Sequence, residues 1–194
     1  YSSRLAAHAA SLATSESDPS RKAELFKIAE VNAKVHAHPP ETFMKALQSI
    51  WTIQSLQSLE TNQCSTSLGR VDQYLYPYFQ RDIECGRITA QDAFELFSCF
   101  MLKCSEVIWY TPSATAKYFV GYMPFINMCA NGIKRHGGDS VNELTYLIMD
   151  AVRQIKLYQP TLACRIHNLS PRKYLNKIAD VIAAGAGMPA CHFD

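Results

Sequence analysis

Apolar residues recur at helical spacing through most of the first 110 positions. After Asp18 they fall at positions 23, 26, 28, 29 and 35, a helical rather than an alternating rhythm. Asp18 followed by Pro19 is typical of a helix start, because the aspartate caps free N–H groups and proline suits the first turn. The pattern predicts packing helices over residues 18–39, 40–59, 71–85 and 90–107, with a polar turn at 61–69. Pro77 should bend or interrupt the third helix, and Thr89 should cap the fourth.

From Thr111 onward, short aromatic and β-branched runs alternate with helical ones. Strands are predicted at 124–128, 160–167 and 188–193, and helices at 140–157 and 172–184, the second of them started by Ser170 and Pro171. A strand, a helix and another strand favour parallel pairing through right-handed crossovers. The sequence therefore predicts a helix-rich α/β fold, with packing helices in 1–110 and βα elements of a sheet or barrel in 111–194.

The composition is that of a globular protein, with 48% hydrophobic residues. Nineteen Lys and Arg residues against 17 Asp and Glu give a net charge of +2 without a basic run, which argues against nucleic acid or an anionic membrane as partner. No apolar stretch approaches the roughly 20 residues that span a bilayer. Seven cysteines, an odd number without a Cys-x-x-Cys pair, favour a reducing cytosol. Because the chain starts at Tyr1 without a signal-peptide pattern and stops within an apolar run, we expect an internal segment of a longer protein.

Cysteine and histidine side chains gather in the last third of the sequence. If the strands at 160–167 and 188–193 are neighbours, Cys164, His167, Cys191 and His192 offer sulfur and nitrogen ligands for a transition metal. Adjacent strand residues point to opposite faces, however, so Cys191 and His192 cannot both contribute easily. A nucleophile pair of Cys164 and His192 would need a third, orienting group that the sequence does not locate. Buried, unreactive cysteines are favoured over either site.

Two further features favour structural roles. Glu143, Asp150 and Asp180 occupy amphipathic positions on predicted helices, which is typical of a solvated face. The glycine-rich loop at 132–138 lacks the spacing of dinucleotide-binding or P-loop motifs and indicates a tight turn.

Aromatic residues are concentrated just before the predicted strand at 124–128. They are Tyr118, Phe119, Tyr122 and Phe125. Most of them are expected in the core. An aromatic face at the end of a buried strand is also what a pocket for a quaternary ammonium group needs, because ring quadrupoles attract such cations.

Several strings, read together, resemble the glycyl radical enzymes, the pyruvate formate-lyase-like superfamily, and they cover nearly the whole chain. Residues 69–78, GRVDQYLYPY, are similar to the Gly-Arg-Phe-Asp-Gln-Tyr segment of that family, and residues 139–150, DSVNELTYLIMD, to the helix that follows it. Within the family, AKYFVGYMPFINM, YQPTLACRIHN and GMPACHFD are most similar to the choline trimethylamine-lyase branch. Tyr158, which stands before the Gln-Pro pair, favours that branch.

The resemblance implies a ten-stranded α/β barrel wrapped in helices and a lyase that converts choline to trimethylamine and acetaldehyde. It also implies a glycyl radical installed by a radical SAM activating enzyme, no bound metal, a homodimer, and a place in the bacterial cytoplasm or a bacterial microcompartment lumen. Phe125 falls where the choline enzymes have an aromatic residue beside the trimethylammonium group. It is the one substrate-binding residue that the resemblance assigns here.

The sequence departs from the family at the catalytic motifs. Neither the Gly-Cys-Val-Glu-Pro motif nor the Arg-Val-Ser/Ala-Gly-Tyr glycyl loop occurs, so no catalytic residue is assigned in this chain, and the segment alone is expected to be inactive. Asn131 stands where relatives often have glycine. The alternatives are another member of the family (an isethionate sulfite-lyase, a glycerol or diol dehydratase, or a formate C-acetyltransferase-like enzyme) and a non-catalytic helical scaffold.

Overall fold

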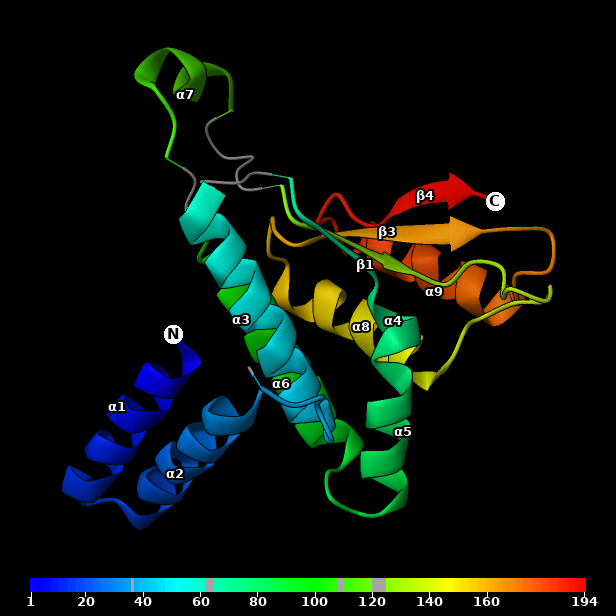
Figure 1. Ribbon diagram of the computed structural model, residues 1–194. Coiled ribbons are helices and arrows are strands. Elements are labelled where there is room, and N and C mark those ends of the chain that lie inside the picture. The colour runs from blue at the N-terminus through cyan, green and yellow to red at the C-terminus, as the bar shows by residue number, and fades with distance from the viewer. Residues whose placement is uncertain (36, 62–64, 108–109, 120–124) are drawn as a thin grey trace.

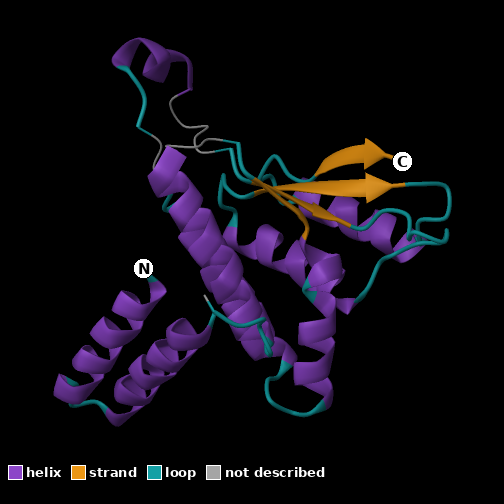
Figure 2. Cartoon of the chain, viewed as in Figure 1, coloured by secondary structure: helices purple, strands orange, loops and turns teal. Residues whose placement is uncertain are grey.

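The computed structural model describes residues 1–35, 37–61, 65–107, 110–119 and 125–194, and it contains a four-stranded parallel sheet (Figure 1). The strands lie side by side in chain order: β1 Ser67–Arg70, β2 Asn127–Ala130, β3 Thr161–Ile166 and β4 Ala190–Phe193. The helices are α1 Ser2–Ser15, α2 Pro19–Lys34, α3 Phe43–Thr61, α4 Val71–Tyr74, α5 Tyr76–Glu84, α6 Ala90–Ser105, α7 Ser113–Phe119, α8 Glu143–Ile155 and α9 Arg172–Ala183. Helices dominate the described residues (Figure 2), so the expected helix-rich α/β fold is confirmed.

Helices α1 and α2 form a hairpin that is separated from the sheet by the long helices α3 and α6 (Figure 1). Alanines on one face of α1 are buried, and their small side chains let α2 approach closely. The predicted cap of α2 is confirmed, because the Asp18 carboxylate accepts a hydrogen bond from the Ser20 N–H at 3.1 Å. The helix ends at Lys34, earlier than the predicted end at Pro39.

Helix α3 begins at Phe43, later than the start at Pro40 that the sequence predicts. Two acceptors fix this start: Thr42 Oγ1 accepts from the Lys45 N–H at 3.2 Å, and Asp82 Oδ2 accepts from the Phe43 N–H at 2.8 Å. Asp82 is 1% exposed and also pairs with Arg87. Because Asp82 lies on α5, a tertiary contact sets the first turn of α3.

The predicted helix at 71–85 is interrupted, as expected, and Pro77 lies in the first turn of its second half, α5. The predicted cap of α6 is also confirmed, since Thr89 and Asp92 exchange hydrogen bonds in a capping box. The polar turn expected at 61–69 is wrong in its last part, where strand β1 pairs with β2. Helix α7 was not predicted either; it is short and buries none of its residues.

The predicted strands and helices of the second half are present with shifted ends. Strand β2 begins at Asn127, later than the predicted 124, and residue 124 itself lies outside the described part of the chain. All three strand pairs are parallel, which confirms the pairing inferred from the strand, helix, strand order. Ser170 does not cap α9 as predicted; its hydroxyl instead accepts a hydrogen bond from the His167 N–H at 3.0 Å.

The core lies between the sheet and the helices that cover one of its faces. Met128, Leu162 and Cys164 are at most 1% exposed and pack in one cluster with residues of α6, α8 and α9. Side chains one position away along the strands, such as Asn127 and Arg165, are only half-buried and lie on the opposite face. Among the described residues, no helix is long and apolar enough to cross a membrane.

Candidate functional site

Two aromatic rings that the sequence analysis had singled out meet before β2: Phe125 lies two residues before the strand, and Phe119 is the last residue of α7. Phe125 and Phe119 lie edge to face, with ring centroids 6.0 Å apart and an interplanar angle of 89°. The φ of Phe125 is 61°, a left-handed conformation that a bulky side chain rarely adopts and that is found more often at functional sites. The other two predicted aromatics do not join this pair: Tyr118 is 82% exposed, and Tyr122 lies outside the described residues.

The strand ends next to Phe125 are uncharged, whereas α7 carries Lys117 two residues before Phe119. Residues 65–69, 125–128 and 158–163, which form the amino ends of β1, β2 and β3, contain no Asp, Glu, Lys or Arg. On the sheet face away from the helices, Thr161 Oγ1 lies 3.2 Å from Asn127 Oδ1, so these two polar side chains bind each other. An uncharged site with aromatic faces suits a ligand whose end is apolar or a diffuse cation.

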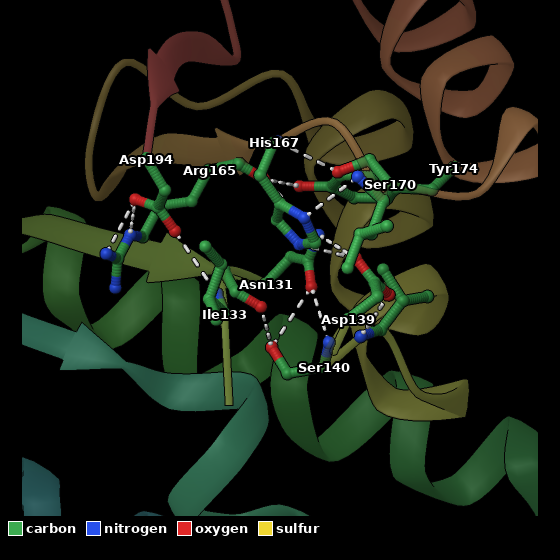
Figure 3. A network of polar contacts seen from close by, with 12 residues as sticks. Asn131, Ile133, Asp139, Ser140, Arg165, His167, Ser170, Tyr174 and Asp194 are labelled. Carbon is green, nitrogen blue, oxygen red and sulfur yellow. Dashed lines mark hydrogen bonds and ion pairs between the residues drawn. The ribbon is translucent and has the colours of Figure 1, made fainter. Parts of the chain in front are cut away.

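The carboxyl ends of the same strands carry a network of polar contacts (Figure 3). Asn131, fully buried, lies near its centre: Nδ2 donates to Asp139 at 3.0 Å and to the Arg165 carbonyl at 3.3 Å. Its Oδ1 accepts from the Ser140 N–H at 3.2 Å and the Ser140 hydroxyl at 3.0 Å. The φ of Asn131 is 64°. This conformation is easy for glycine and tolerated by asparagine, which explains how asparagine can stand where relatives often have glycine.

Asp72 connects this network to the helices. It is fully buried, and its Oδ2 accepts from the Asn131 N–H at 2.8 Å and from Thr145 Oγ1 at 2.7 Å. Burial raises the pKa of the Asp72 carboxyl, although these hydrogen bonds favour the charged form. Arg70 donates to the Ser140 hydroxyl at 2.6 Å. The aspartate and the arginine of the GRVDQY string therefore tie strand β1 to the loop after β2.

His167 and Arg165 complete the network at the end of β3. His167 Nδ1 accepts from the Leu169 N–H at 3.2 Å, and Nε2 lies 3.0 Å from the Asp139 carboxylate. Arg165 pairs with Asp194 at 2.6 Å. Most of these polar groups bind other groups of the chain, although Arg70 Nε, Asp72 Oδ1 and His167 Nε2 accept or donate no hydrogen bond among the described residues.

The proposed sulfur and nitrogen ligands are not assembled. Strands β3 and β4 are neighbours, as expected, with Cys164 opposite Cys191 and Arg165 opposite His192. His192 therefore faces away from Cys164, and the idea of a nucleophile pair between them is wrong. No group of three or more His, Cys, Asp or Glu residues in the described ranges is placed to hold a metal ion. Burial raises the pKa of the Cys164 thiol to about 12, which makes this cysteine a poor nucleophile.

The acidic residues expected on a solvated face lie on α8 and α9. Glu143 and Asp180 are exposed, as predicted. Asp150 is half-buried and pairs with Lys177 on α9, so its role is to join the two helices. Glu143 accepts a hydrogen bond from the Tyr76 hydroxyl at 2.6 Å.

Comparisons with known proteins place these elements in a larger context. The profile of the family described as "Pyruvate formate lyase-like" matches residues 1–194. The chain is 37% identical over 191 residues to isethionate sulfite-lyase of Oleidesulfovibrio alaskensis, which covers 97% of this chain and 23% of that protein. A glycyl radical enzyme from Archaeoglobus fulgidus superposes with a TM-score of 0.94 at 38% identity, over 100% of this chain and 25% of the other. The glycerol-bound B12-independent glycerol dehydratase from Clostridium butyricum superposes with a TM-score of 0.95 at 34% identity, over 100% and 24%.

The chain thus spans about a quarter of the length of the relatives that it matches. The resemblance to glycyl radical enzymes is confirmed at the level of the family. The relatives named above are an isethionate lyase and a glycerol dehydratase, so the choline branch indicated by the three strings remains a prediction.

Proposed function

Because the chain belongs to the pyruvate formate lyase-like family, we propose that the intact protein is a glycyl radical lyase that cleaves the C–N bond of choline. The products would be trimethylamine and acetaldehyde. The relatives support a glycyl radical lyase or dehydratase in general, and the choice of choline rests on the aromatic pair at the amino end of β2.

The single observation that carries the proposal is the right-angled contact of Phe125 and Phe119. A trimethylammonium group forms no hydrogen bonds, and it is held by the faces of aromatic rings and by dispersion. The described amino ends of β1 to β3 offer no cationic side chain, which a sulfonate or carboxylate would need. Two rings at right angles can contact a spherical trimethylammonium group on two sides.

The residues of this chain bind and orient the substrate in this proposal. A glycyl radical, when present in the intact enzyme, supplies the hydrogen abstraction that starts the reaction. The motifs for the thiyl cysteine, its acid–base glutamate and the glycyl loop do not occur among the seven cysteines and eight glycines of this chain. The intact protein would also need a radical SAM activase, and we propose a homodimer in the bacterial cytoplasm or a microcompartment.

Substitution of Phe125 in the intact protein tests the proposal. Phe125→Ala should weaken the binding of choline by about 0.5 to 2 kcal/mol if the ring contacts the cation. Tyr118→Ala, which removes an aromatic ring that is 82% exposed, is the matched control and should leave binding unchanged. Unchanged choline KM and turnover in the Phe125 variant would remove this role from the residue.

The second candidate is an isethionate sulfite-lyase, which the 37% identity favours. Competition of choline against isethionate and glycerol for the intact protein separates the three substrates. Preferential binding of isethionate or glycerol would reject the choline assignment. A complete gene that lacks the cysteine and glycyl motifs would instead support the non-catalytic scaffold.

A further inference from the structure

A cavity of about 570 Å³ opens between α2, the start of α3 and α5. Five cationic side chains line it, Lys27, Lys34, Lys45, Arg81 and Arg87, against three carboxylates. Five positive and three negative charges leave an excess of two, which equals the net charge of the whole chain. Because positive charge is gathered in a cavity here, this part of the molecule attracts anions.

Lys45 is the most buried of these cations. Its side chain is 11% exposed, and its ammonium group lies 2.7 Å from the carboxylate of Glu41, whose side chain is 71% exposed. The hydrogen bond from Lys45 and its charge, with a smaller effect of the Lys34 charge, lower the pKa of the Glu41 carboxyl. The buried ammonium group is thus paired with a carboxylate that is mostly in water. Ion pairs with exposed partners are weak, so another anion can displace this carboxylate.

Lys27 and Arg81 are the two cations that the carboxylates leave over. Neither forms an ion pair among the described residues. The guanidinium group of Arg81 lies 5.6 Å from the centroid of the Tyr78 ring, a cation–π contact that orients it. A guanidinium group with unused N–H donors can bind a phosphate through two hydrogen bonds.

Apolar side chains form another part of the wall. Val31 is buried, and Met44 and Leu96 are half-buried in the same cavity. The volume lies within the range of about 300 to 1,000 Å³ that small-molecule sites have, and it exceeds what a single anion fills. A ligand of this cavity should therefore combine an anionic group with a small apolar body.

We propose that the cavity binds a small phosphate ester. Its phosphate group takes the place of the Glu41 carboxylate on Lys45 and accepts hydrogen bonds from Arg81, while its apolar body contacts the apolar wall. The excess of two positive charges in the wall matches a phosphate monoester, which carries about −1.5 to −2 at pH 7. The Glu41 side chain, already mostly exposed, moves fully into water when the ester binds.

Calorimetry on the intact protein without activation tests this site, with inorganic phosphate and phenyl phosphate as probes at constant ionic strength. Wild-type protein should bind phenyl phosphate about tenfold more tightly than inorganic phosphate, because the ring contacts the apolar wall. Lys45→Gln and Arg81→Gln should each weaken the binding of phenyl phosphate by about tenfold or more. Glu41→Gln should instead tighten it by about two- to fivefold, because the competing carboxylate is gone.

The ion pair of Lys103 and Glu106 on α6 provides the matched controls, since both side chains are exposed. Lys103→Gln and Glu106→Gln should leave the binding of phenyl phosphate unchanged. Circular dichroism and the melting temperature establish that each variant is folded. If Lys45→Gln does not fold, Arg81→Gln and Glu41→Gln, which change exposed side chains, still give the opposite shifts that the proposal requires.

Four results would overturn the proposal. They are the absence of saturable binding of phenyl phosphate, binding no tighter than that of inorganic phosphate, weaker binding in Glu41→Gln, and equal losses in Lys103→Gln and Arg81→Gln. The last of these would show that the anion is attracted by general surface charge. None of these results bears on the choline assignment, because the probes and variants leave the aromatic pair unchanged.

Discussion

Asn131 offers a sharp test of how the loop after β2 is held. Replacing it with alanine removes four side-chain contacts, two to Ser140 and one each to Asp139 and the Arg165 carbonyl. The partners are not left alone: the Ser140 N–H also donates to the Gly132 carbonyl at 3.2 Å, and the single hydrogen of the Ser140 hydroxyl can turn to the same carbonyl at 2.7 Å. The cost per contact should therefore be a net hydrogen-bond contribution at the low end of its range, about 0.5 to 1 kcal/mol.

The backbone adds a second, separable cost. Asn131→Gly should destabilise the loop by about 2 to 4 kcal/mol, because glycine loses the four side-chain contacts but adopts the φ of 64° without strain. Asn131→Ala loses the same contacts and also forces an alanine into the left-handed region, at a cost of about 1 to 2 kcal/mol, which brings its total to about 3 to 6 kcal/mol. Alanine should thus be worse than glycine by about 1 kcal/mol or more.

Hydrogen exchange of the intact protein measures the loss of the side-chain contacts and the backbone cost at the loop itself. Peptides that cover residues 127–145 report the local opening free energy of the loop. Asn176→Ala, at an exposed position on α9, is the matched control and should leave these peptides unchanged. Equal effects of alanine and glycine at Asn131 would refute the argument from φ. Losses below about 0.5 kcal/mol in both variants would show that the network does not stabilise the loop.

Three other changes have definite expected outcomes. Asp82→Ala should destabilise the first turn of α3 by about 1 to 3 kcal/mol in hydrogen exchange, because the Phe43 N–H loses its acceptor. Asp82→Asn should recover part of this loss, and equal effects of the two variants would contradict the tertiary cap. Burial raises the pKa of Asp72, so the stability that its neutral form contributes is present below the unfolded pKa near 3.8 and is lost as pH rises through the folded pKa. Asp72→Asn should therefore lose less stability than wild type as pH rises above about 4 in urea unfolding, and parallel curves would contradict this. Burial also raises the pKa of the Cys104 and Cys164 thiols to about 12. Iodoacetamide at neutral pH should therefore modify these thiols far more slowly in the native protein than in urea. Similar rates in the two states would show that the thiols are not buried.

Features with a local cause could be predicted from the sequence. The caps at Asp18 and Thr89 bind N–H groups two or three residues away, so the pattern of residues contains the whole interaction. The interruption of the helix at 71–85 follows from Pro77 in the same way. Parallel pairing of β3 and β4 follows from the helix between them, because a crossover returns the chain in the same direction.

In the candidate site, too, some features could be predicted from the sequence and others only from the structure. The position of Phe125 came from the family resemblance, but its edge-to-face contact with Phe119 and its left-handed backbone came only from the structure. The proposed Cys164 and His192 pair failed because the strand register, which the sequence does not specify, turned the two side chains to opposite faces.

By itself, the sequence determined the helix-rich α/β fold, the capped helices and the glycyl radical enzyme family. Only the tertiary structure decided where α3 begins, that residues 67–70 form a strand, and how the loop after β2 is held. Asp82 caps Phe43 across 39 positions, and Asp72 binds Thr145 across 73. Contacts at such separations depend on how the elements pack, because they form only after distant segments meet, and no local pattern of residues encodes them.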